Sequence, residues 1–140
     1  MFFSSLLFAL LPAALAKNIA ISVGANNGLT ITPNQTTAAV GDTLTFTFLT
    51  KNHSVTTTVF SGAVCPPPAG GVGPNAFDSG FLSATATDTP TFVYTVVDTA
   101  PHFAACMQGG GSHCRAGMTF ALNPTAAMTY AEFNTNAANS

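Results

Sequence analysis

Charged side chains are scarce in this sequence, with three Lys and Arg and five Asp and Glu among 140 residues, a charged fraction of 6%. The few cations form no basic patch, so the composition argues against nucleic acid as a partner. There is also no run of charge that could hold an anionic membrane surface. Thr, Ser and Asn must therefore supply most of the surface polarity, which favours an extracellular protein.

Long apolar runs are missing too, except at the N-terminus. Residues 1–16 have the pattern of a secretory signal peptide, with an apolar run over residues 6–11 and small residues before a cleavage position after Ala16. That run is too short for the competing interpretation, a membrane anchor, so we expect no stable membrane insertion. The C-terminal tail has no long apolar stretch, which argues against a lipid anchor added there.

The remaining chain, residues 17–140, suits a single domain with its own core and is too short for two. Several short segments alternate apolar with polar residues, which is typical of strands with one buried face. These segments are residues 19–23, 43–48, 53–60, 92–96 and 118–122. Turn-forming residues separate them, including a Pro-rich loop at 65–74. The pattern predicts an all-β sandwich or barrel, with a short helix within residues 125–138.

Cysteine is present in an odd number: Cys65, Cys106 and Cys114. A secreted domain normally pairs its cysteines, so one is left over. The leftover cysteine could be a reactive thiol, half of an intermolecular disulfide, or a metal ligand.

A Gly-rich stretch gathers soft metal ligands around one of these cysteines. Cys106, His113 and Met118 lie within it, and His53 begins an upstream strand segment. Each residue alone has an ordinary structural explanation, but two imidazoles, one thiolate and a weak thioether together are the ligand set that holds copper in both oxidation states. Zinc would favour four strong ligands. Glycines at 109–111 would let Cys106 and His113 converge.

The same motifs carry a family resemblance over essentially the whole mature domain. Residues 52–55, 77–81, 101–106 and 113–118 resemble, in order, the fungal extracellular cupredoxin-like proteins, relatives of the plant phytocyanins and plastocyanins. The resemblance implies a Greek-key β-sandwich of cupredoxin type with one mononuclear type 1 (blue) copper site. Carried over by position, the ligands would be His53, Cys106, His113 and, axially, Met118. It also implies a disulfide between Cys65 and Cys114, which leaves Cys106 free.

Two features depart from the family pattern. Bulky aromatic residues commonly precede the ligand cysteine, but here Phe103 is followed by two alanines. The stretch between Cys106 and His113 is also longer than in phytocyanins. An additional imidazole, His102, lies near the ligand cysteine in sequence. We interpret His102 as a surface residue, with a role as substitute ligand as the alternative.

The resemblance and the ligand set together predict a secreted protein that binds one copper ion, cycling between Cu(II) and Cu(I). Its expected role is electron transfer or copper carriage at the cell exterior with an unidentified redox partner, and cell-wall association would fit. We expect a monomer, with Asn34 in a glycosylation sequon. We expect no enzyme, because three histidines cannot build the trinuclear site of a multicopper oxidase. The alternative is an extracellular structural or interaction module that does not use copper.

Overall fold

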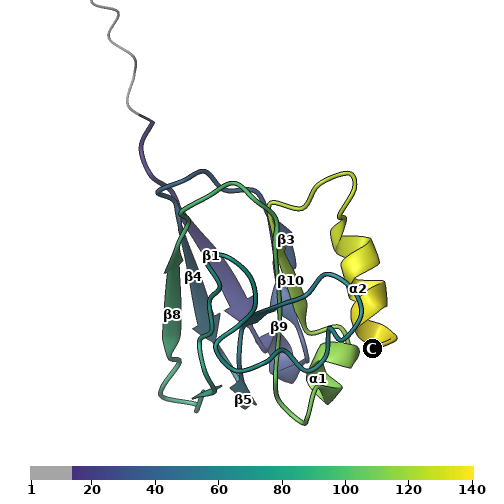
Figure 1. The fold of residues 1–140 in the computed structure, drawn as a ribbon. Helices are drawn as coiled ribbons and strands as arrows, with labels where there is room; N and C mark the ends of the chain where they lie inside the picture. Colours follow the sequence, from purple (N-terminus) through teal and green to yellow (C-terminus); the bar gives the residue numbers. More distant parts are fainter. Residues whose placement is uncertain (1–13) are drawn as a thin grey trace, which may run out of the picture.

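The computed structural model describes residues 14–140, and residues 1–13 of the expected signal peptide lie outside them. Two four-stranded sheets lie face to face (Figure 1). The first has the order β2-β1-β4-β8, and the second has the order β3-β10-β9-β6. The strands of the first sheet are β1 (Asn18–Val23), β2 (Ile31–Thr32), β4 (Thr43–Phe48) and β8 (Thr91–Thr95). The strands of the second are β3 (Gln35–Thr36), β6 (Thr56–Thr58), β9 (His102–Ala105) and β10 (Thr119–Leu122).

Smaller elements surround this sandwich. β5 (Asn52–His53) pairs antiparallel with β7 (Leu82–Ser83), and a 3-10 turn, η1 (Ala25–Asn27), follows β1. The short helix α1 (Ser112–Arg115) lies between β9 and β10, and α2 (Tyr130–Ala138) closes the chain. In Figure 1, β5 and α1 lie at the same end of the molecule, opposite the end at which the chain enters β1.

The core between the sheets follows from strict alternation in β4. Its threonines are half-buried, whereas Leu44, Phe46 and Phe48 are fully buried. The Phe46 ring meets Phe120 of the other sheet edge-on, with ring centroids 5.3 Å apart. Such an edge-to-face arrangement matches the charge distribution of aromatic rings and adds to the burial of their surface. The Phe46–Phe120 contact therefore joins the two sheets directly.

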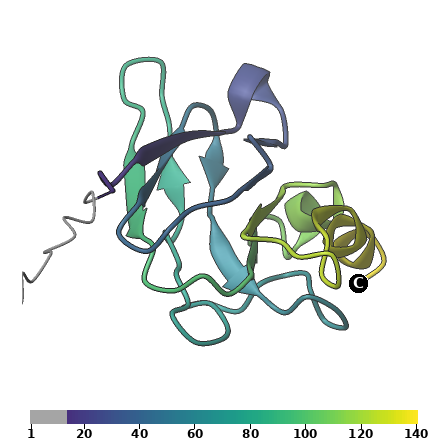
Figure 2. The same ribbon diagram turned by 90° about the horizontal axis from the view of Figure 1, so that it is seen from above.

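Strands β9 and β10 of the second sheet are buried on both faces, because α2 covers their outer side (Figure 2). Phe103 and Ala105 of β9 pack in one cluster with Phe133 and Ala137 of the helix. The rings of Phe103 and Phe133 lie 4.8 Å apart. The hydroxyl of Thr129 caps the helix by accepting a hydrogen bond from the Glu132 amide. The protein thus has three layers, with β9 and β10 in the middle one.

The all-β sandwich and the short closing helix predicted from the sequence are confirmed. One predicted strand, residues 53–60, is instead divided into β5 and β6. Strand β9 was missed because all four of its residues are buried, so it shows no alternation of apolar and polar residues. No helix in the described part of the chain is both long and apolar enough to cross a membrane.

Candidate metal centre

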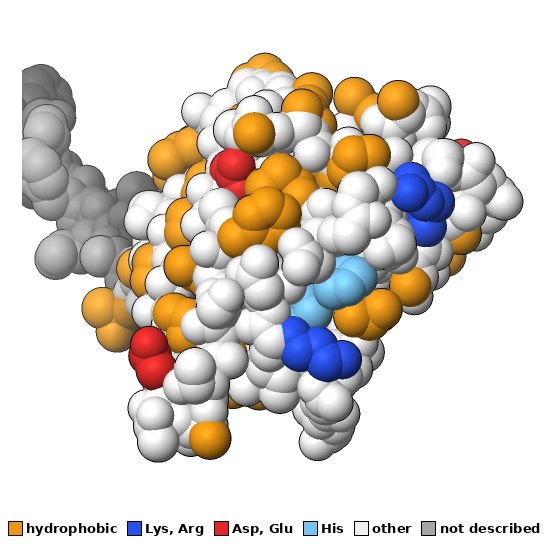
Figure 3. Space-filling model, turned by 90° about the horizontal axis from the view of Figure 1, so that it is seen from below, with side chains coloured by type: hydrophobic (Ala, Val, Ile, Leu, Met, Phe, Trp, Pro, Cys, Tyr) orange, Lys and Arg blue, Asp and Glu red, His pale blue; other side chains and the backbone are white. Residues whose placement is uncertain are grey.

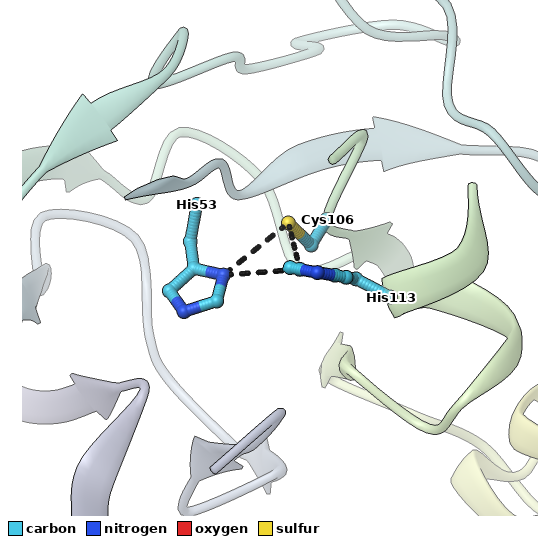
Figure 4. Close-up of side chains that lie close together, drawn as sticks. All are labelled: His53, Cys106 and His113. Atoms are coloured by element: carbon cyan, nitrogen blue, oxygen red, sulfur yellow. Dashed lines mark hydrogen bonds between the residues drawn. The ribbon is translucent and has the colours of Figure 1, made fainter. Parts of the chain in front are cut away.

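Three side chains from separate segments converge at the end of the sandwich formed by β5 and α1 (Figure 4). His53 lies on β5, Cys106 directly follows β9, and His113 lies on α1. The Nδ1 atoms of the two imidazoles are 3.2 Å apart, and the Cys106 Sγ lies 3.8 Å from each of them. The structure therefore brings together three of the four residues that the sequence suggested as metal ligands.

The ligand loop reaches this geometry because both of its ends are fixed. The Cys106 amide donates to the Met118 carbonyl at 3.1 Å, next to the antiparallel pair of β9 and β10. Inside the loop, the Met118 amide donates to the His113 carbonyl at 3.0 Å. Gly109, Gly110 and Gly111 all have positive φ, a conformation that other residues adopt only at a cost. Helix α1, which the sequence analysis did not expect, then turns His113 back toward Cys106.

His53 is held from two sides. β5 pairs with β7, so that His53 lies opposite Leu82. On the other side lies Gly24, whose φ is +76° and where a Cβ atom would come within 3.0 Å of the His53 Cδ2 and Nε2 atoms. The Nε2 atom is buried and has no hydrogen-bond partner among the described residues. Packing beside Gly24, together with the contacts of Nδ1 with Cys106 and His113, therefore fixes this ring.

The surroundings keep both imidazoles neutral. Burial, together with the nearby charges of His113 and Lys51, lowers the pKa of His53 to about 4. Burial and the Lys51 charge also lower the pKa of His113, which is partly exposed. A neutral imidazole is the form that binds metals, and protonation would compete with binding. His53 is therefore available as a ligand even in mildly acidic solution, and His113 is shifted in the same direction.

Cys106 is a free thiol that is fully buried. Burial raises its pKa, while hydrogen bonds from the Ser54 and Gln108 amides oppose that shift. These amides donate to Sγ at 3.3 and 3.4 Å. Without a metal the thiol therefore stays protonated and shielded. A bound metal would displace the proton, and both amides would then stabilise the thiolate.

Ser54 is a supporting residue that the sequence analysis missed. Its amide donates to Cys106 Sγ, and its buried hydroxyl accepts a hydrogen bond from the Met107 amide at 2.9 Å. These two bonds tie the segment that carries His53 to the segment that carries Cys106. Its position directly after His53 was the available signal, but nothing in the sequence shows that residues 54 and 106 are neighbours.

The three donor atoms fit a single copper ion. A point equidistant from them lies about 2.1 Å from each, close to the roughly 2.0–2.1 Å of a zinc–imidazole bond and somewhat below the roughly 2.3 Å of a zinc–thiolate bond. The donors are one thiolate and two neutral imidazoles, which suit copper. No side-chain movement of more than a few tenths of an ångström is needed to place a metal between them.

Met118 and His102 have different positions relative to these donors. Met118 is fully buried and packs in the same apolar cluster as Cys106. Its role as an axial ligand stays a prediction. His102 is only 8% exposed, and its Nε2 lies 2.7 Å from Asp98 Oδ1. Its interpretation as a surface residue is therefore wrong, because a carboxylate four residues earlier lets the imidazole be buried at the start of β9.

A disulfide joins Cys65 to Cys114, as the family resemblance implied. Cys114 directly follows His113 on α1, and Cys65 lies in the Pro-rich loop. The Arg115 guanidinium adds a hydrogen bond to the Cys65 carbonyl at 3.2 Å. The disulfide therefore fixes α1 against the Pro-rich loop, and it keeps Cys114 from competing with Cys106 for a metal.

The low pKa of His53 makes the stability of the copper-free protein depend on pH. The unfolded chain takes up a proton near pH 6.5, whereas folded His53 resists protonation until about pH 4, so stability falls as the pH drops through this window. Between pH 7 and pH 5 we expect a loss of about 2 kcal/mol in the free energy of unfolding, measured by urea denaturation. A His53→Gln variant should lose most of this dependence. An unchanged dependence in that variant would assign the effect to another group.

Gly24→Ala tests whether packing against the His53 ring positions the ligand. The new Cβ meets both the ring and the Thr50 hydroxyl, so we expect Cu(I) affinity to fall by about tenfold in a chelator competition. Gly41→Ala is the matched control, because Gly41 also has a positive φ but has no atom within 4 Å of the added Cβ. Both variants should lose roughly 1 kcal/mol of stability from backbone strain. Equal copper affinities would show that Gly24 does not position His53.

Removal of the disulfide should loosen the metal centre. The two cysteines are 49 residues apart, and opening a loop of that length costs about 3–4 kcal/mol in the chain-entropy model. In a Cys65→Ala/Cys114→Ala double variant, which leaves no additional thiol, we expect that loss of stability together with weaker Cu(I) binding. A chelator competition on folded protein measures the second effect. Unchanged copper affinity would show that α1 holds His113 without the bond.

No protein-family model matches the chain. A curated relative, described as a probable GPI-anchored cupredoxin-1 of Arthroderma benhamiae, is 29% identical over 116 residues, which cover 83% of this chain. The match covers 56% of that relative, so the chain spans little more than half of its length.

Solved structures show the same fold. A purple cupredoxin from Nitrosopumilus maritimus superposes with a TM-score of 0.52 at 14% identity, covering 74% of this chain and 96% of that one. A mutant plastocyanin of a fern superposes with a TM-score of 0.51 at 22% identity, also covering 74% and 96%. The predicted cupredoxin-type sandwich is thus confirmed. The chain therefore has the cupredoxin fold, and its sequence is similar to that of a protein described as a fungal cupredoxin.

Proposed function

We propose that this protein is an extracellular mononuclear type 1 copper protein that transfers electrons. The observation that carries the proposal is the arrangement of one thiol and two imidazoles, whose donor atoms lie within 4.8 Å of one another before any metal is bound. A centre of this kind, when loaded with copper, supplies a one-electron Cu(II)/Cu(I) couple. The proposed ligands are His53, Cys106 and His113, with Met118 in the axial position.

Each residue has a separate task in this proposal. Cys106 supplies the thiolate, and the Ser54 and Gln108 amides hold its charge in place. His53 completes the set from a buried position beside Gly24, where an added Cβ atom would lie 3.0 Å from the ring. His113 is partly exposed, so its ring connects the buried donors with solvent. Histidine atoms reach the surface on this end of the molecule (Figure 3).

The rigidity of the site favours electron transfer over copper carriage. A protein that delivers copper must open its site to release the ion, but here a disulfide and a short helix fix His113, and Cys106 is fully buried. A one-electron carrier instead gains from ligands that stay in place when the metal changes its charge. Copper carriage is the second candidate function of the same site. Fast transfer of Cu(I) from the protein to a chelator would support copper carriage over electron transfer.

An extracellular location fits the chain on several counts. It has the signal-like N-terminus, the disulfide expected of an oxidising compartment, and a curated relative described as GPI-anchored. Asn34 of the predicted sequon lies exposed between β2 and β3, where a glycan could be attached. We accordingly propose a cell-surface or cell-wall setting in which an unidentified redox partner docks weakly, as is usual for such proteins.

Absorption and EPR spectra of the copper-loaded protein test the proposal. The wild type should show the intense visible band of a thiolate-to-copper charge transfer, and Cys106→Ser should abolish it, because Cys106 is the only thiol outside the disulfide. His113→Gln should weaken or shift the band. His102→Gln is the matched control and should keep the band, since His102 pairs with Asp98 away from the site.

Two outcomes would contradict the proposal. A folded wild-type protein that stays colourless with Cu(II) would instead support a structural or interaction module built on the cupredoxin fold. Retention of the band in Cys106→Ser would show that the copper binds elsewhere. Circular dichroism of each variant separates these outcomes from a failure to fold.

A further inference from the structure

Two of the three cations in the chain flank the exposed histidine of the metal centre. Lys51 precedes His53 by two residues, and Arg115 follows His113 by two. Both side chains are exposed. On the face that contains the site, basic side chains lie to either side of the histidine atoms, one beside them and one farther away (Figure 3). The third cation, Lys17, precedes β1 at the opposite end of the molecule (Figure 1).

Both flanking cations are held in place without a carboxylate. The Lys51 ammonium donates to the Asn27 carbonyl at 3.1 Å. The Arg115 guanidinium donates to the Gly110 carbonyl at 2.9 Å and to the Cys65 carbonyl. Among residues 14–140, the one ion pair within 4.0 Å is that of His102 with Asp98. The two charges are therefore positioned by backbone carbonyls and remain uncompensated.

Three of the five acidic residues are engaged elsewhere. Asp42 accepts hydrogen bonds from the Lys17 and Ala39 amides, at the far end of β1. Asp98 pairs with His102, and the Asp78 carboxylate accepts hydrogen bonds from Thr56, Gly70 and Gly80. In Figure 3 the acidic atoms do not touch the histidine: one group lies beside a hydrophobic patch and the others lie nearer the edges of the face. In a chain whose formal net charge is −2, the surface next to the metal centre is thus locally positive.

Apolar atoms occupy part of the surface near the cations. Phe81 is 50% exposed and directly precedes Leu82, the residue that pairs with His53. Lys51 directly precedes β5 and Arg115 ends α1, and the two bind different carbonyls, so they do not converge on one small site. Two separated charges with exposed apolar surface nearby suit a broad, weak docking face more than a pocket for a small anion.

We propose that the Lys51–His113–Arg115 face is the docking surface for an acidic redox protein, whose carboxylates would meet the two cations while its centre faces His113. The proposal rests on the proposed electron-transfer function for the nature of the partner. The binding face itself is independent of the metal. Charge complementarity of this kind mainly speeds encounter and selects among partners, and it weakens as salt is added.

NMR titration of the ¹⁵N-labelled copper-free protein, repeated on the Cu(I) form, tests the proposal with a hexaglutamate peptide as the probe. We expect amide shifts in residues 50–53, 80–82 and 107–115, and these shifts should shrink as the ionic strength rises from about 0.01 M to about 0.15 M. Lys51→Gln should weaken binding by about threefold or more, and Lys51→Arg should restore it. Lys17→Gln, which removes the same charge at the other end, should leave binding unchanged.

Three results would overturn the proposal. Equal shifts with a hexalysine peptide would show that charge complementarity plays no part. Equal weakening by Lys17→Gln and Lys51→Gln would show an effect of net charge rather than of this face. Binding of the inert trianion hexacyanocobaltate(III), with no binding of the peptide, would assign the face to small anions. The titration can be done on the copper-free protein. Its result therefore tests the docking face even if the protein proves not to bind copper.

Discussion

The hydrogen bond from the Cys106 amide to the Met118 carbonyl is the constraint on which the metal centre depends. It continues the pairing of β9 with β10 by one step and so closes the ligand loop at its base. Everything between these two residues must then turn back within a short span. Three glycines with positive φ and one turn of helix accomplish this, and they place His113 Nδ1 at 3.8 Å from Cys106 Sγ. The positions of the ligands are therefore fixed by the paired strands β9 and β10, which are buried on both faces.

Burial then determines the chemistry of the three donors. It lowers the pKa of both histidines and raises that of the cysteine, so each group is neutral when no metal is present. Three neutral donors close together avoid the repulsion that charged groups would suffer, and the folded protein can keep the site assembled. The exposed edge of His113 is the exception to this burial. The His113 ring therefore connects the buried donor atoms with a surface on which Lys51 and Arg115 supply a local positive charge.

Much of this could be predicted from the sequence, because the signals were local. The alternation of Thr with Leu and Phe in residues 43–48 predicted β4. The odd number of cysteines predicted one leftover cysteine, which the family resemblance identified as Cys106. The signals that failed were non-local. The burial of His102 depends on Asp98, and the support from Ser54 depends on a contact across 52 residues. The two alanines before Cys106, which looked like a departure from the family, face opposite sides of the sheet: Ala105 packs in the cluster under α2, and Ala104 packs in the core between the sheets.

Crystal structures of the copper-free and Cu(I)-loaded protein test the central claim, that the donor atoms are in place before the metal arrives. We predict that His53 Nδ1, Cys106 Sγ and His113 Nδ1 keep their relative positions within about 0.5 Å, the tolerance of a preorganised site. The same comparison would place the Met118 sulfur relative to the ion. A loop 107–117 that refolds on loading, or a copper ion bound without Cys106, would contradict the account.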